Sequence, residues 1–456
     1  MPRIPALVGL TYHIVTFGCQ MNQHDAERVS GLLDDCGCIE VASFEEADIA
    51  VFMTCCVREN ADTRLYGQAS ALVSMVAPPS GRRILAIGGC IAQRDGANLR
   101  AHIPNVDVVF GTSALAVLPD LLVEALEQTG KRGPIVDTVE VDRSFSTDLP
   151  SHREQAFHAW VPIMTGCNNF CTYCIVPYVR GRERSRVLER VVEECASLVS
   201  DGVREICLLG QNVNSYGRDL YGEPRFAELL REVGKTGIER IRFTSSNPKD
   251  LSDETIAAMA ATPSVMPQLH LAVQSGSTRV LRAMNRSYTR EEYLELVSRI
   301  RAAIPDIALS TDIIVGFPGE TEEDFEDTLS LVREVNYASA YTFIYSKREG
   351  TPAAKVVDPT PREVIQARFD RLAALVAQQA HDANQLDLGR EVEVLVEGPS
   401  KRNPSVLVGH SRKNQTVHFE VPDTMQAADL IGKLCDVRVD EARTWYLSGP
   451  LVGSPR

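Results

Sequence analysis

The stretch TGCNNFCTYC, residues 165–174, contains three cysteines at spacings of four and three residues. An apolar run at 161–164 precedes it and predicts a strand, so the cysteines lie in the loop that follows that strand. This loop can wrap the thiols of Cys167, Cys171 and Cys174 onto three corners of one cube-shaped iron–sulfur cluster, because thiolates are the soft ligands that such clusters need. With only three thiolates present, the fourth iron stays open to a small ligand.

Two other interpretations of these cysteines are weaker. A tetrahedral zinc site needs a fourth Cys or His at short spacing, and none occurs between Ile175 and Arg186. Three core cysteines that share this spacing by accident have odds of about one in a hundred per chain. We therefore expect an iron–sulfur cluster in this loop.

Apolar runs alternate with helical stretches through the central part of the chain, from Phe157 to about Asp387. The predicted strands are residues 161–164, 206–209, 241–244, 269–273, 313–315 and 341–345. Six strands separated by helices predict a partial (βα)6 barrel, in which reacting groups gather at the carboxyl ends of the strands.

The N-terminal part has the same alternating pattern, with predicted strands at residues 13–17, 49–53, 84–87 and 106–110. This pattern predicts an α/β domain built on a mostly parallel sheet. Residues 130–153 are rich in charge, Gly, Ser and Thr without a clear period, and they predict a linker.

A second set of cysteines follows three of these N-terminal strands. Cys19, Cys55 and Cys90 each stand directly after an apolar run. Because the carboxyl ends of parallel strands share one edge of a sheet, these distant thiols can converge. Cysteine is also a common core residue, and packing is the prediction for the remaining six: Cys36, Cys38, Cys56, Cys195, Cys207 and Cys435. In particular, Cys56 is expected to point away from its neighbour Cys55.

After Gly389 the pattern changes to closely spaced alternating runs, at residues 392–396, 406–408, 417–421 and 435–439. These runs predict a small antiparallel β-barrel. The expected organisation is thus three domains, at 10–130, 153–387 and 389–453, in an α/β protein.

The composition and charge of the chain restrict the compartment and the partners that it can have. The chain has 456 residues, no apolar run near the roughly 18 to 20 residues of a membrane span, and no signal-peptide pattern at its start, so a cytoplasmic protein without membrane contact is expected. That compartment keeps thiols reduced and disulfides there are rare, so metal ligands and buried apolar thiols are the interpretations for its 12 cysteines. The net charge of −14 argues against general attraction to nucleic acid, so any RNA site must be a local patch.

The Cys-x3-Cys-x2-Cys spacing resembles the signature of radical S-adenosylmethionine enzymes. The sequences FGCQMN (17–22), TCCVRENA (54–61), PYVRGRERSR (177–186) and GFPGET (316–321) resemble the methylthiotransferase family within that group, and the resemblance covers nearly the whole chain. Met53, Ala272 and Glu349 depart from the family pattern, but none of them is a candidate ligand.

The resemblance implies two [4Fe–4S] clusters and S-adenosyl-L-methionine as cofactors. Cys167, Cys171 and Cys174 would hold the cluster that generates the radical, and Cys19, Cys55 and Cys90 would hold an auxiliary cluster. By the same resemblance, S-adenosyl-L-methionine would be bound by Tyr173, Gly210 and Gln211. A packed aromatic and a simple βα turn are the alternatives for them. Residues 316–324 lack the Lys and the spacing of a phosphate loop, and they predict a helix capping box instead.

The C-terminal segment 389–456 is neutral and contains a stretch, Gly409 to Asn414, that resembles the TRAM domain, a small RNA-binding barrel. The resemblance implies RNA contacts by Arg412 and Lys413, with base stacking on Phe419 unless that ring is part of the core. A second basic stretch consists of Arg180, Arg182, Arg184 and Arg186. Contact with phosphate or carboxylate and a solvated strand edge remain equal alternatives for it.

Within the family, the short sequences QMN (20–22) and NVN (212–214) are similar to those of the MiaB-type enzymes. That similarity implies methylthiolation of C2 of N6-isopentenyladenosine at position 37, in the anticodon loop of tRNA, by a chain that acts as a monomer and takes electrons from a separate donor. The C2 hydrogen is not acidic, which explains the need for a radical cofactor. The alternatives are sister enzymes that act on threonylcarbamoyl-adenosine or on a ribosomal protein aspartate, and a non-catalytic iron–sulfur electron carrier or RNA-binding protein.

Overall fold

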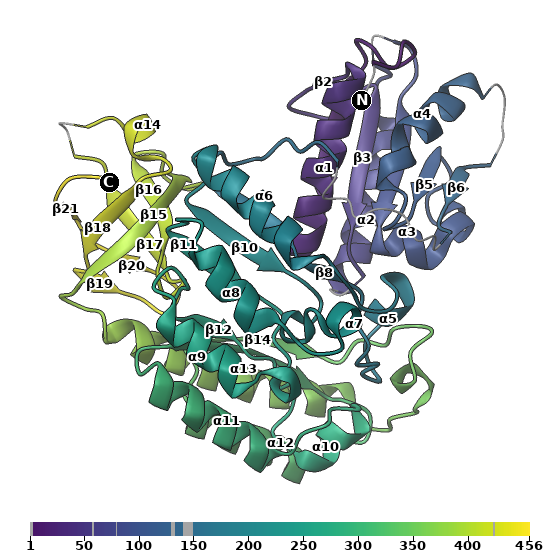
Figure 1. Ribbon diagram of the computed structural model, residues 1–456. Helices are drawn as coiled ribbons and strands as arrows, with labels where there is room; N and C mark the ends of the chain where they lie inside the picture. The colour runs from purple at the N-terminus through teal and green to yellow at the C-terminus, as the bar shows by residue number, and fades with distance from the viewer. Residues whose placement is uncertain (1–2, 57–58, 79, 129–132, 140–148, 423–424) are drawn as a thin grey trace. The chain divides into compact units, whose positions relative to one another are not determined.

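The computed structural model describes residues 3–56, 59–78, 80–128, 133–139, 149–422 and 425–456 (Figure 1). The chain forms two compact units. The first comprises residues 1–154, 160–168 and 174–186, and the second comprises 155–159, 169–173 and 187–456. The boundary passes through the cysteine loop, so that Cys167 and Cys174 belong to the first unit and Cys171 to the second.

The first unit is built on a six-stranded, wholly parallel sheet, in the order β2-β1-β3-β4-β5-β6. Its strands are β1 (Thr11–Thr16), β2 (Ile39–Glu40), β3 (Ile49–Thr54), β4 (Ile84–Gly89), β5 (Val108–Phe110) and β6 (Ile135–Asp137). Every residue of β3 and β4 is buried, as expected for central strands of a parallel sheet with both faces covered. The parallel α/β prediction is confirmed.

The helices of the first unit are α1 (Gln20–Cys36), α2 (Glu59–Ser74), α3 (Cys90–Asp95), α4 (Leu118–Glu127) and α5 (Val176–Val179). A short hairpin of β8 (Met164–Thr165) and β9 (Arg184–Ser185) also belongs to it. The linker prediction for 130–153 was wrong at β6, which pairs with β5 as the last strand of the sheet. A strand of only three residues is too short to produce a recognisable period.

The second unit contains five strands of the partial barrel that the alternation predicts: β10 (Glu205–Leu209), β11 (Arg240–Phe243), β12 (Gln268–His270), β13 (Ala308–Val315) and β14 (Ser339–Ile344). The sixth, β7 (His158–Pro162), is divided between the units, with residues 158–159 in the second and 160–162 in the first. They form the ladders β11-β10-β7 and β12-β13-β14, and a parallel bridge between Ser246 and Leu271 joins the two. β7 ends earlier than predicted, at Pro162, because proline has no amide hydrogen to donate to a ladder.

Helices follow the barrel strands in sequence (Figure 1). They are α6 (Leu188–Ser200), α7 (Arg218–Tyr221), α8 (Phe226–Gly234), α9 (Asp253–Ala261), α10 (Thr278–Ala283), α11 (Arg290–Ala303), α12 (Glu322–Val335) and α13 (Arg362–Gln385). Among the residues that the structure describes, no helix combines the length and the apolar character that crossing a bilayer requires.

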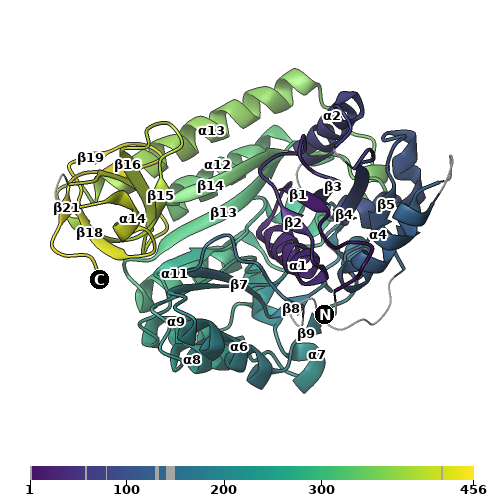
Figure 2. The ribbon, with the colours of Figure 1, turned by 90° about the horizontal axis from the view of Figure 1, so that it is seen from above.

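The C-terminal part of the second unit is a seven-stranded sheet that curls into a barrel-like shape (Figure 2). Its elements are β15 (Glu391–Pro399), β16 (Val406–Ser411), β17 (Thr416–Glu420), α14 (Ala427–Leu430), β18 (Leu434–Arg438), β19 (Glu441–Ala442), β20 (Leu447–Ser448) and β21 (Leu451–Val452). The strand pairs are antiparallel except for β17 with β20, which confirms the predicted small antiparallel barrel.

Two buried arginines of β11 attach the C-terminal sheet to the barrel within the second unit. The Arg240 side chain is 0% exposed and donates hydrogen bonds to the backbone oxygen of His410 at 2.9 Å and to Oε1 of Glu393 at 3.0 Å. Arg242 donates to the backbone oxygen of Ser411 at 2.7 Å. Buried cations need such partners, because an unpaired charge in the interior is costly.

Candidate functional site

Three strand-end cysteines gather at one edge of the first unit's sheet. Cys19 precedes α1, Cys55 follows β3, and Cys90 is the first residue of α3, directly after β4. Because β1 and β4 both pair with β3, the carboxyl ends of the three strands are neighbours. The Cys19 and Cys55 thiols are hydrogen-bonded to each other, so cysteines separated by 36 positions do converge.

Two glycines allow this close approach. Gly18 has a φ of +115°, and a Cβ atom there would lie 2.1 Å from the Cβ of Cys55. Gly89 has a φ of +90°, and a Cβ atom there would lie 2.5 Å from the backbone oxygen of Thr54. Any larger residue before Cys19 or Cys90 would therefore collide with the end of β3 and separate the thiols.

Cys56 was predicted to point away from the other thiols, and this prediction was wrong. Cys56 is 0% exposed, and its thiol is hydrogen-bonded to that of Cys90. It also packs in the core that lies between the sheet and α2 and α3, so the predicted burial is confirmed. The site thus contains four thiols, in the pairs Cys19–Cys55 and Cys56–Cys90.

A buried cation lies among these thiols. The Arg180 side chain is 6% exposed, and its guanidinium is hydrogen-bonded to the Cys90 thiol. It also donates to Oδ1 of Asn22 and to Oδ2 of Asp25, both at 3.1 Å. The sequence left two alternatives for this basic stretch, contact with phosphate or carboxylate and a solvated strand edge. For Arg180 the ion pair with the Asp25 carboxylate agrees with the first alternative, and its burial excludes the second.

The surroundings favour thiolates at two positions. The hydrogen bond from Cys55, aided by the charge of Arg180, lowers the pKa of Cys19 to about 6 against the opposing effect of burial. The hydrogen bond from Cys56, again aided by Arg180, lowers the pKa of Cys90 to about 7. The hydrogen bond to Cys90 and burial raise the pKa of Cys56 well above its ordinary value. Cys19 also stands at the N-terminus of the 17-residue helix α1, where the helix dipole favours an anion.

This donor set fits an iron–sulfur cluster better than a single metal ion. In the described part of the chain, no three His, Cys, Asp or Glu side chains form a site for one ion. The thiolates of a cluster bind different iron atoms, and sulfur is the donor that such clusters require. The buried positive charge of Arg180 would offset the negative charge that thiolates bring into the interior.

The cysteine loop 165–174 is held in part by the first unit. Gly166 has a φ of +75°, and a Cβ atom there would lie 2.0 Å from the backbone oxygen of Arg182. The Cys167 amide donates to the oxygen of Gly181 at 3.1 Å, and the Asn168 amide donates to the buried carboxylate of Glu183 at 3.2 Å. The segment that follows the loop thereby fixes the backbone around Cys167.

The second unit holds the middle of the same loop. Asn285 donates to the backbone oxygens of Asn169 and Phe170 at 3.0 and 3.1 Å, and the Thr172 hydroxyl donates to the oxygen of Ala283 at 2.8 Å. Arg286, which is 8% exposed, lies with Nη1 at 3.7 Å from the sulfur of Cys171. Sequence reasoning missed Arg286, because a single arginine between two helices carries no recognisable pattern.

The predicted cofactor residues lie at carboxyl ends of barrel strands or next to them. Tyr173 packs against four buried apolar side chains, which agrees with the alternative of a packed aromatic. These are Val280, Met284, Phe317 and Ala353. Gly210 is buried and Gln211 half-buried, directly after β10. Close to them, three buried oxygens have no hydrogen-bond partner among the described residues: Oδ1 of Asn212, Oδ1 of Asn214 and Oγ of Ser246. Buried acceptors without donors are rare, and they mark places where a polar ligand fits.

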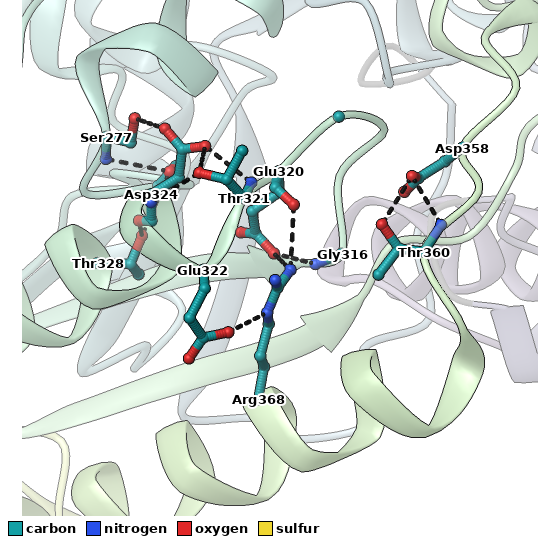
Figure 3. A network of polar contacts seen from close by, with 12 residues as sticks. Ser277, Gly316, Glu320, Thr321, Glu322, Asp324, Thr328, Asp358, Thr360 and Arg368 are labelled. Atoms are coloured by element: carbon teal, nitrogen blue, oxygen red, sulfur yellow. Dashed lines mark hydrogen bonds and ion pairs between the residues drawn. The ribbon is translucent and has the colours of Figure 1, made fainter.

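The turn after β13 has the predicted helix cap (Figure 3). Thr321 and Asp324 form a reciprocal capping box at the start of α12. Glu320 accepts a hydrogen bond from the Gly316 amide at 2.8 Å and another from Arg368 at 3.4 Å. Burial raises the pKa of Glu320 to about 7 despite these two donors.

The predicted RNA-binding residues are not equivalent. Phe419 is 2% exposed and lies in the core of the C-terminal sheet, so the stacking prediction was wrong and the core alternative holds. The Arg412 side chain is 41% exposed and donates to the backbone oxygen of Pro263 at 3.0 Å. Lys413 is 28% exposed and lies 3.5 Å from Asp387. Side chains along a strand point alternately to its two faces, but the sequence pattern does not tell which face is the inner one. The structure places Phe419 on the inner face.

The other cysteines predicted to pack are all buried: Cys36, Cys38, Cys195, Cys207 and Cys435. Burial raises the pKa of Cys38 to about 12 and that of Cys435 to about 11, which keeps these thiols protonated. Their environment is thus opposite to that of Cys19 and Cys90.

Three family models match the chain. They are described as "Radical SAM superfamily", over residues 161–332, "Uncharacterized protein family UPF0004", over 11–111, and "TRAM domain", over 385–452. Among solved structures, a radical S-adenosylmethionine methyltransferase, TsrM, from Kitasatospora setae has a TM-score of 0.54 at 14% identity, covering 76% of this chain and 74% of that one. This likeness concerns the fold alone.

Curated relatives are much closer in sequence. A protein of Acetivibrio thermocellus is 48% identical over 447 residues, which cover 97% of this chain and 91% of the relative. A protein of Acidothermus cellulolyticus is 52% identical, covering 91% of this chain and 83% of the relative. Both are named tRNA-2-methylthio-N(6)-dimethylallyladenosine synthase.

Proposed function

Because the chain belongs to the family of tRNA-2-methylthio-N(6)-dimethylallyladenosine synthases, we propose that it adds a methylthio group to C2 of N6-isopentenyladenosine at position 37 of tRNA. The observation that carries this proposal is the 48% identity over 97% of the chain. The family is one of radical S-adenosylmethionine enzymes, which use a [4Fe–4S] cluster and S-adenosyl-L-methionine. A tRNA substrate is in keeping with a cytoplasmic enzyme.

The two cysteine sets have separate roles in this proposal. Cys167, Cys171 and Cys174 hold one [4Fe–4S] cluster, and Cys19, Cys55 and Cys90 hold a second one. When bound, the first cluster with S-adenosyl-L-methionine supplies a radical, and the second cluster supplies sulfur. The convergence of Cys19 with Cys55, and the thiolate-favouring surroundings of Cys19 and Cys90, support the second assignment.

The protein's own side chains orient the cluster ligands and bind the cofactor. Arg286 keeps the Cys171 thiolate in place with a charged hydrogen bond and is itself fixed by Tyr288, whose hydroxyl accepts from Nε at 2.9 Å. Gly210 and Gln211 bind S-adenosyl-L-methionine, and Tyr173, which is only half-buried among its apolar neighbours, contacts the same cofactor. The partnerless oxygens of Asn212, Asn214 and Ser246 accept hydrogen bonds from its amine or hydroxyl groups, which supports the same strand ends as the cofactor site.

The three predicted domains divide the work. Residues 10–130 carry the auxiliary cluster, 153–387 carry the radical chemistry, and 389–453 hold the anticodon loop of tRNA. Arg412 and Lys413 contact the RNA backbone, and their partial exposure supports this role. The target base must leave its stack to react, which an anticodon loop permits at modest cost.

The test is mass spectrometry of tRNA nucleosides from a strain that lacks the gene. Loss of the 2-methylthio derivative, with accumulation of N6-isopentenyladenosine, supports the proposal. Restoration by the wild-type gene and not by a Cys171→Ala variant assigns the change to this protein. Unchanged isopentenyladenosine derivatives together with loss of methylthio-threonylcarbamoyl-adenosine, or of the modified ribosomal aspartate, would identify a sister activity instead.

A further inference from the structure

Helix α1 buries several polar side chains where an amphipathic helix would bury apolar ones. Asn22 is 0% exposed, His24 1% and Asp25 3%. Burial of polar or charged groups is unfavourable unless hydrogen bonds compensate for the lost water. These side chains therefore need polar partners, and Asn22 and Asp25, three residues apart on one side of the helix, have theirs in Arg180.

These side chains form a continuous hydrogen-bonded chain that ends at the thiols. Arg28 Nε donates to His24 Nε2 at 3.2 Å, and His24 Nδ1 lies 3.3 Å from Asp25 Oδ1. Because Nε2 accepts, Nδ1 carries the hydrogen and donates it to the Asp25 carboxylate. The other oxygen of Asp25, Oδ2, accepts from Arg180, whose guanidinium also contacts the Cys90 thiol.

The backbone of Arg180 is fixed as firmly as its side chain. Its amide donates to the oxygen of Val176 at 2.9 Å, which closes the short helix α5. The Thr112 hydroxyl donates to the oxygen of Val179 at 3.0 Å, and Val179 packs in the same core as Cys90. The guanidinium is therefore held beside the thiols and is not a side chain that can swing into solvent.

We propose that Arg180, oriented by Asn22 and Asp25, is a positioning residue that sets the reduction potential of the N-terminal cluster. This inference rests on the proposed function, in which Cys19, Cys55 and Cys90 hold that cluster. A buried positive charge beside the thiolates favours the reduced cluster, which carries one more negative charge, and Asp25 partly cancels that effect. Net charge and hydrogen bonds to sulfur are the means by which a protein tunes a cluster's potential.

A purely structural salt bridge is the alternative role for this pair. It predicts that loss of either partner changes stability in the same direction, because each variant leaves an uncompensated buried group. The electrostatic role predicts shifts of opposite sign in the potential. Removal of the positive charge makes reduction harder, and removal of the negative charge makes it easier.

The experiment uses the full chain with Cys167, Cys171 and Cys174 all changed to Ala, so that only the N-terminal cluster remains. This parent is reconstituted with iron and sulfide, its iron content is measured, and its potential is determined by a redox titration followed by electron paramagnetic resonance. Arg180→Gln and Asp25→Asn are compared with it. Arg182→Gln is the matched control, since Arg182 is exposed and its loss changes the net charge equally.

The expected result is an Arg180→Gln potential lower by about 59 mV, a tenfold change in the one-electron equilibrium, with Asp25→Asn shifted upward and the control unchanged. Equal potentials in all variants, or shifts of the same sign in Arg180→Gln and Asp25→Asn, overturn the inference. If Arg180→Gln loses its iron, two further variants test the role. Arg180→Lys keeps the charge and should retain both the iron and the potential of the parent. Asp25→Asn should retain the iron and have a higher potential than the parent, and an unchanged potential in Asp25→Asn overturns the inference. A parent without iron contradicts the proposed function itself.

Discussion

The Nη1 atom of Arg286 lies 3.7 Å from the sulfur of Cys171, within the second unit. Arg286 is buried, and Tyr288, Tyr173 and Cys171 around it raise its pKa although burial alone would lower it. It therefore keeps its positive charge beside the middle cysteine of the loop, and its partners leave it little freedom to move.

Arg286→Gln should lower the rate of 5′-deoxyadenosine formation about 10- to 100-fold, because partners that orient a metal ligand typically contribute that much. Arg286→Lys should recover part of the rate, since it keeps the charge. Arg282→Gln, at an exposed position four residues earlier, is the control. The measurement is product formation from S-adenosyl-L-methionine with dithionite. A wild-type rate and iron content in Arg286→Gln would show that the arginine only packs.

The double change Arg412→Ala and Lys413→Ala should flatten the salt dependence of tRNA binding. Loss of two phosphate contacts reduces the slope of log affinity against log salt by about 1.4 to 1.8. Filter binding at several salt concentrations measures it, with Lys433→Ala and Arg438→Ala as the exposed control pair. An unchanged slope in the first pair would remove both residues from the RNA site.

Glu320 should make the protein less stable as the pH rises through the neutral range. Its pKa is raised from 4.5 to about 7, so the folded state binds a proton that the unfolded state has released. This group contributes its full stabilisation below about pH 4.5, and the contribution is lost between pH 4.5 and 7, a difference of about 3 kcal/mol. Glu320→Gln should lack this loss in thermal unfolding between pH 5.5 and 8. Parallel pH profiles of the two proteins would refute the assignment.

Arg240→Ala should reduce the free energy of unfolding by about 3 to 5 kcal/mol, because it removes a fully buried side chain that pairs with Glu205 and Glu393 and leaves the backbone oxygen of His410 without its donor. Arg438→Ala breaks only an exposed pair with Asp440 and should cost at most about 1 kcal/mol. Denaturant unfolding measures both. Similar small losses in the two variants would mean that Arg240 is not needed to attach the C-terminal sheet.

Much of the architecture could be predicted from the sequence because its signals are local and periodic. The strand runs before Cys55 and Cys90 have the length and apolar character of buried parallel strands, and parallel pairing with the half-buried β1 then brings all three strand ends together. The capping box at Thr321 is likewise read from residues three apart. The missed strand β6 has three residues, which is below the length at which a period is visible.

The rest of the candidate site could not be predicted because it depends on tertiary contacts. Arg180 stands among alternating arginines, and only the fold reveals that Asp25, 155 positions earlier, binds it in the interior. The contact of Arg286 with Cys171 spans 115 positions. Phe419 occupies a strand whose two faces look alike in sequence, so its burial follows from packing against Val394 and Leu407.

We propose that the two cysteine sets hold two clusters with different tasks, so variants of the two sets should fail differently. Cys174→Ala should lose about one cluster's worth of iron and all 5′-deoxyadenosine formation. Cys56→Ala, the adjacent control, should keep nearly all its iron because its thiol is protonated.

The decisive measurement combines iron content with 5′-deoxyadenosine and methylthio-nucleoside formation in reconstituted Cys55→Ala. This variant should lose about one cluster, still cleave S-adenosyl-L-methionine and form no methylthio product. Full iron content with normal methylthio product would contradict it, and loss of iron in Cys56→Ala instead would move the ligand by one residue.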